Sequence, residues 1–108
     1  MNNEEEFIIK RISATEISTN VPHLISWHSP SDFSNKSEFN FGYMGTGPHE
    51  LSANILWVMD VFPEKECLAW ASKFSEEVLN YLPNQGGKIN KSEVNDWIKS
   101  KNIKQKNV

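Results

Sequence analysis

The sequence predicts a single α+β domain in which a small antiparallel sheet is followed by three helices packed on one face. β-branched and aromatic residues gather in the part of the chain before Gly42, whereas apolar residues at helical spacing dominate the part that follows. Prolines separate the helical stretches from one another. A chain of 108 residues, 38% of them hydrophobic, is long enough to bury one core.

The predicted strands lie in the first half of the chain. Residues 1–6 contain three consecutive glutamates, so we expect them to be disordered. Residues 7–17 are rich in isoleucine and threonine and suit one strand or two short ones. Two further short strands are expected over 24–27 and 38–41, the second because Phe39 and Phe41 alternate with polar residues.

The predicted helices occupy the second half. Pro48 is placed as the first residue of a helix that ends before Pro63. A second helix is expected from Pro63 or Glu64 to Leu82, with Cys67 on its buried stripe. The two glycines at 86–87 predict a turn. A third helix is predicted to be capped by Asn90 and Glu93, so that residues 7–99 form the domain and residues 100–108 a basic flexible tail.

Composition excludes several classes of function. Residues 1–87 carry twelve acidic and five basic side chains, so the body of the protein is acidic and direct binding of duplex DNA is not expected. No apolar run reaches the roughly 20 residues of a membrane span, and we expect a cytoplasmic protein. One cysteine and three histidines without paired spacing predict no metal site and no cofactor.

The most informative segment runs from Phe39 to Pro48. Three glycines in six residues between a predicted strand and a predicted helix let the backbone approach another group closely. A helix start also offers N–H groups to a phosphate or carboxylate. The alternative is that the glycines only allow a sharp turn, because the spacing matches neither the P-loop nor the dinucleotide fingerprint.

A second candidate segment surrounds His28, at the start of a polar loop where ligand contacts often collect. Its alternative is a histidine that only bonds a loop carbonyl. Together the two segments give a predicted ligand site of eight residues, which are Trp27, His28, Ser29, Tyr43, Gly45, Thr46, Gly47 and His49.

These segments resemble an uncharacterised family, a domain of unknown function in short bacterial and bacteriophage proteins. The resemblance covers residues 24–98 and is carried by His28-Ser29-Pro30, the stretch Phe41-Gly42-Tyr43-Met44-Gly45-Thr46-Gly47-Pro48, the helix with Leu51, Ala53, Ile55 and Leu56, the sequence Tyr81-Leu82-Pro83, and the closing residues Ile89 to Ile98. Phe41, Met44 and Thr46 replace the family's tryptophan, glycine and serine. The resemblance implies that the His28 loop and the glycine loop belong to one unit.

Three functional hypotheses remain open. The first is a non-enzymatic binding protein that takes a small anionic ligand, such as a nucleotide, and that in a phage would sequester a host immune signal. The second is a protein-interaction module, for example a phage-encoded inhibitor of a host defence nuclease, which binds a host protein through Glu64, Glu66, Glu76 and Glu77. An enzyme ranks last, because the sequence offers no set of base, nucleophile and metal ligands.

Overall fold

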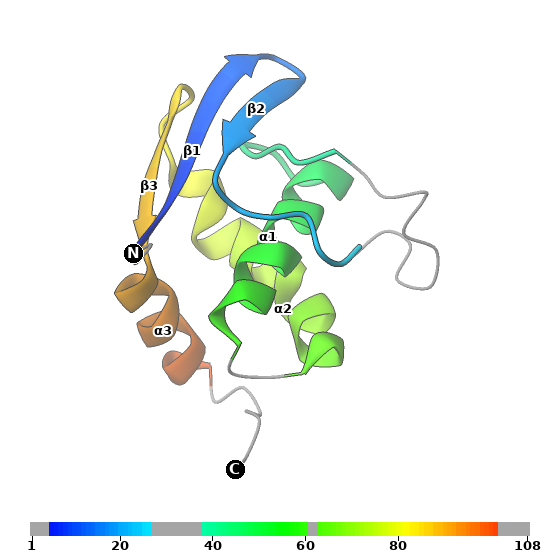
Figure 1. Ribbon diagram of the computed structural model, residues 1–108, viewed down its shortest axis with the longest axis vertical. Helices are drawn as coiled ribbons and strands as arrows, with labels where there is room; N and C mark the ends of the chain where they lie inside the picture. The colour runs from blue at the N-terminus through cyan, green and yellow to red at the C-terminus, as the bar shows by residue number, and fades with distance from the viewer. Residues whose placement is uncertain (1–4, 27–37, 61–62, 102–108) are drawn as a thin grey trace.

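The computed structural model describes residues 5–26, 38–60 and 63–101 and confirms the α+β class (Figure 1). Three strands form one antiparallel sheet in the order β2-β1-β3. Their bounds are Glu6–Ser13 for β1, Glu16–Thr19 for β2 and Gly86–Asn90 for β3. The helices are α1 at Thr46–Met59, α2 at Glu64–Glu77 and α3 at Lys91–Ser100, with a short 3-10 helix, η2, at Leu79–Tyr81.

The central strand β1 has one buried and one exposed face. Phe7 and Ile9 are buried in the core with side chains from all three helices. Ile8 and Ile12 point to the opposite face and stay 43% and 59% exposed. Because strand side chains alternate, this pattern places the helices on one face of the sheet, as the sequence predicts.

The third strand comes from a segment that the sequence assigns to a turn. Gly86 and Gly87 pair with Lys10 and Ile9 of β1, so β3 enters the sheet after α2 instead of before the helices. Gly86 has a φ of +106°, and a Cβ atom there would lie 2.1 Å from the carbonyl oxygen of Ile9. The glycine is therefore required by close packing of two strands.

The strands predicted over 24–27 and 38–41 are wrong for the residues that the structure describes, which are 24–26 and 38–41. A side chain replaces the sheet partner in the first segment, because the carboxamide of Asn54 binds the N–H groups of Leu24 and Ile25 and the carbonyl of Ile25. In the second segment, the N–H of Asn40 donates to the carbonyl of Gly47 at the start of α1.

Helix bounds differ from the expected ones by a few residues. The first helix begins at Thr46, two residues before Pro48, and Asp60 follows it in the left-handed conformation with a φ of 56°. The second helix ends at Glu77 and tightens into η2 before Pro83. The capping box of Asn90 and Glu93 is confirmed, with the Asn90 N–H donating to Glu93 Oε1 over 2.9 Å.

None of the described helices has the length and apolar character needed to cross a lipid bilayer.

Candidate functional site

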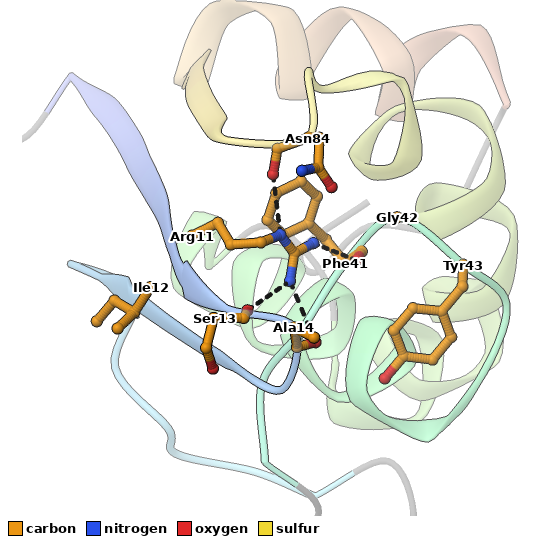
Figure 2. Close-up of a pocket in the computed structure, with 8 residues that line it drawn as sticks. All are labelled: Arg11, Ile12, Ser13, Ala14, Phe41, Gly42, Tyr43 and Asn84. Atoms are coloured by element: carbon orange, nitrogen blue, oxygen red, sulfur yellow. Dashed lines mark hydrogen bonds between the residues drawn. The ribbon is translucent and has the colours of Figure 1, made fainter.

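The glycine loop forms one wall of a pocket at the end of the β1–β2 hairpin (Figure 2). The pocket has a volume of about 470 Å³, within the range of about 300–1,000 Å³ that small-molecule sites occupy. Its lining residues come from the hairpin, from the start of the glycine loop and from the turn after η2, and they are Arg11, Ile12, Ser13, Ala14, Phe41, Gly42, Tyr43 and Asn84.

The guanidinium of Arg11 lies between these three segments (Figure 2). Its Nε donates to the carbonyl of Asn84 over 2.9 Å and its Nη2 to the carbonyl of Phe41 over 2.9 Å. Its Nη1 donates to the Oδ1 atom of Asn40 over 3.0 Å and to the carbonyls of Ser13 and Ala14. The group also sits 4.4 Å from the ring centre of Phe41. One side chain thus joins three parts of the chain that are distant in sequence.

The charge of Arg11 is not neutralised by a carboxylate in the described part of the chain, because every acceptor named above is an uncharged oxygen. A guanidinium has five N–H groups, and its Nη2 carries two of them. The carbonyl of Phe41 takes one, so the other has no acceptor among the described residues. A partly buried cation with a spare donor, on the wall of a pocket, is suited to bind an anion.

Asn80 of η2 holds the glycine loop in place. Its Oδ1 accepts the N–H of Gly42 over 2.7 Å, and its Nδ2 donates to the carbonyl of Tyr43 over 3.0 Å. The backbone of Gly42 has a φ of 96°, a region that glycine adopts without strain. These two bonds therefore hold the backbone of Gly42 and Tyr43 in place.

The predicted helix-start site has a different geometry from the one expected. The ring of Tyr43 lies against Gly45, and its hydroxyl lies 2.9 Å from the position a Cβ atom would take at Gly47. Gly47 is buried between Tyr43, Asn40 and the carbonyl of Glu38. Thr46 is exposed. Its side chain does not cap α1, because the N-cap residue of this helix is Gly45. Tyr43 thus covers two of the predicted ligand-binding glycines with its own ring and reaches the Arg11 pocket as well.

His49 lies one turn into α1, where its N–H donates to the carbonyl of Gly45 over 3.2 Å. Its side chain is partly buried, and this burial lowers its pKa from the ordinary value of 6.5. His49 does not line the Arg11 pocket. The other three predicted ligand residues, Trp27, His28 and Ser29, lie outside the described residues.

The four glutamates of the alternative interface all lie on α2. Glu64 and Glu66 belong to its first turn, where negative charge suits the helix dipole. At the other end, Glu77 accepts hydrogen bonds from Lys101 over 2.6 Å and from the indole of Trp97 over 3.0 Å, and these two bonds lower the pKa of Glu77. Glu76 lies 3.8 Å from Lys73. The C-terminal half of this acidic face is therefore partly engaged by the chain's own basic groups.

A buried polar cluster, which the sequence did not predict, joins the segment 21–26 to α1. Glu50 of α1 is completely buried, and its carboxylate contacts His23 Nε2 over 2.6 Å and Ser26 Oγ over 3.3 Å. The ring of His23 stacks on Phe39 at 4.2 Å between ring centres. Together with Asn54, this cluster anchors an irregular segment to α1. No group of three or more possible metal ligands occurs in the described residues.

The key pocket residues were not visible to sequence reasoning. Arg11 bonds the backbone of Asn84 across 73 residues of chain, and Asn80 bonds the backbone of Gly42 across 38. One feature of the sequence sets Arg11 apart: it is the single arginine, and the other ten of the eleven lysine and arginine residues are lysines.

Comparison with known proteins gives one result. A sequence model of a family of unknown function, DUF6166, matches residues 10–100, which include every residue of the Arg11 pocket. No curated protein and no solved structure matches the chain.

Proposed function

This chain belongs to the family of unknown function DUF6166, and we propose that it is a small non-enzymatic binding protein whose Arg11 pocket takes a small anionic, nucleotide-like ligand. The observation that carries the proposal is the partly buried guanidinium of Arg11. It has a spare N–H, and every acceptor it meets in the described chain is uncharged.

The pocket also offers surfaces for the uncharged part of such a ligand. Tyr43 is 49% exposed and Ile12 is 59% exposed, so both present apolar area at the pocket. The half-exposed aromatic ring of Tyr43 is suited to stack against a planar base. The hydroxyl of Ser13 and the carboxamide of Asn84 add polar groups for orientation.

The hydrogen bonds that hold the loop support a site that binds its ligand without closing around it. Because Asn80 and Arg11 already hold residues 41–43, little conformational entropy is lost when a ligand arrives. A cytoplasmic protein of this kind, if carried by a phage, would lower the free concentration of a host nucleotide signal by stoichiometric binding.

Calorimetric titration of the purified protein with cyclic AMP, AMP, ATP and inorganic phosphate tests the proposal. We expect saturable binding of at least one nucleotide, with no change in its ³¹P spectrum during incubation. Asn84→Asp places a negative charge in the pocket without changing the side chain's size and is expected to weaken binding at least about tenfold. Gln85→Glu adds the same charge to the neighbouring exposed residue, which does not line the pocket, and is the matched control.

Equal weakening by both variants, or absence of binding to every probe, would reject the proposed pocket. Chemical turnover of a bound nucleotide would reject the non-enzymatic assignment. Both variants are expected to fold, because the side-chain amides of Asn84 and Gln85 make no hydrogen bond within the described chain.

A further inference from the structure

The Arg11 pocket contains a single formal charge. Of its eight lining residues, Arg11 is basic, none is acidic, and the rest are uncharged. Only one N–H of the guanidinium is left for a ligand, since the described chain takes the others. The site therefore offers one charge-assisted hydrogen bond to one anionic oxygen.

The surroundings of the pocket carry the opposite charge. A neighbouring hollow shares Ile12 with it and is lined by Glu16 and Glu38. Glu16 pairs with Ser13 across the β1–β2 turn, so its carboxylate belongs to the same end of the hairpin. Residues 1–87 as a whole carry a net charge of −7. Negative charge that extends out of the pocket is thus repelled by the protein.

We infer that the ligand carries one negative charge on a planar or apolar body, and that among nucleotides the pocket selects a phosphodiester, such as a cyclic nucleotide, over terminal phosphates. This inference rests on the proposed function and assigns the ligand class of the same site. A terminal phosphate carries about −1.5 to −2 at neutral pH, and a triphosphate carries more. One guanidinium donor neutralises a phosphodiester but leaves these groups with uncompensated charge beside Glu16 and Glu38.

The apolar walls agree with a compact ligand. Ile12 and Tyr43 present carbon surface on two sides of the pocket, and Phe41 lies beneath the guanidinium. A chain of phosphates would gain nothing from these side chains, whereas a base would bury part of them.

A charge series tests the inference. Dissociation constants are measured by calorimetry for cyclic AMP, AMP and ATP without added metal, at low salt and at about 0.1 M salt, where the Debye length falls to about 10 Å. We expect cyclic AMP to bind at least about tenfold more tightly than ATP at low salt, with AMP between them. The gap is expected to narrow as salt is raised, because screening weakens the repulsion by the acidic body.

A matched pair of variants tests whether the selection arises in the pocket. Ile12→Lys adds a second cation to the lining, at an exposed position of β1. Ile8→Lys adds the same charge to the same exposed face of the same strand, outside the pocket. We expect Ile12→Lys to shift the preference towards AMP by several fold, and Ile8→Lys to leave the order of the three nucleotides unchanged.

The outcomes separate the two proposals. Absence of binding to all three nucleotides overturns the proposed function. Binding in which ATP equals or exceeds cyclic AMP at low salt overturns the charge selection and leaves the pocket assignment standing. The same shift in both lysine variants also overturns it, because the selection would then follow net charge alone.

Discussion

Asn80 accepts the backbone N–H of Gly42 over 2.7 Å and donates to the next carbonyl, that of Tyr43, over 3.0 Å. One carboxamide thus satisfies both a donor and an acceptor of a loop that has no strand partner. Gly42 is exposed in this loop, so the two hydrogen bonds, more than burial in the core, hold its backbone in place.

Replacing Asn80 by Ala is therefore expected to loosen the wall of the Arg11 pocket. Loss of both bonds lowers the free energy of unfolding by about 1–3 kcal/mol. Urea denaturation measures this loss, and faster hydrogen exchange at the Gly42 amide locates it. Asn95→Ala on α3 removes a carboxamide that makes no hydrogen bond to the other described residues and is expected to change stability by less than about 0.5 kcal/mol. A Gly42 amide that exchanges equally slowly in both variants would contradict the role of Asn80.

The paired glycines of β3 allow a sharp test of strand packing. Gly86→Ala forces a Cβ atom to within 2.1 Å of the Ile9 carbonyl oxygen and imposes a strained positive φ, so we expect a loss of about 3 kcal/mol or more. Gly87→Ala meets the end of the Leu82 side chain at 3.3 Å and Pro83 Cδ at 3.8 Å, and the expected loss is about 1 kcal/mol or less. Chemical denaturation of the two variants measures the difference. Equal stability would show that β3 does not pack on β1 as described.

The side chains of Glu50 and His23 are predicted to be energetically coupled. Glu50 is completely buried, so Glu50→Gln and His23→Gln each change one side of a contact that is closed to solvent on the Glu50 side. In a double-mutant cycle at pH 7 we expect a coupling free energy of about 0.5–3 kcal/mol. Glu64→Gln, at an exposed residue of the first turn of α2, serves as the control and is expected to show no coupling with His23→Gln. A cycle that closes to zero would mean that the two groups act independently.

The lowered pKa of His49 predicts a loss of stability in mild acid. The unfolded chain binds a proton at His49 near pH 6.5, whereas burial delays protonation in the folded protein to a lower pH. Stability is therefore expected to fall as pH drops from 6.5 through the folded-state pKa of His49. His49→Gln removes this contribution, so its stability profile between pH 7.5 and 5 is expected to be flatter than that of the wild type. Identical slopes in thermal melts across this range would contradict the assignment.

The parts of the fold that sequence reasoning predicted well are those with local causes. The α3 start was predicted because Asn90 and Glu93 are three residues apart, and their capping box depends on little else. The stripe of α2 was predicted because Cys67, Ala71 and Phe74 recur at helical spacing, and all three are buried.

The errors arose where distant residues decide the conformation. Phe39 and Phe41 alternate like a strand, but Asn40 between them bonds Gly47 and Arg11, which holds the segment against α1 and β1 instead of in the sheet. Glycine has a low strand propensity, so Gly86 and Gly87 do not indicate a strand. Gly86 is nevertheless part of β3, because it lies so close to the backbone of Ile9 that a Cβ atom would not fit.

The candidate site shows the same division. The sequence pointed to the glycine loop, and Tyr43 of that loop does line a pocket. It did not point to Arg11, since the acceptors of Arg11 include Asn84, which is 73 residues away. The binding roles of Gly45, Thr46, Gly47 and His49 stay predictions, as do those of the three residues that lie outside the described chain.

The late arrival of β3 has a consequence for synthesis on the ribosome. A nascent chain that stops before Gly86 contains β1 and β2 but leaves one edge of β1 without its antiparallel neighbour. Such a hairpin, with Phe7 and Ile9 still facing water in part, is a target for proteases and for pairing with other strands. The free edge of β1 is therefore covered only when Gly86–Asn90 has emerged and paired with it.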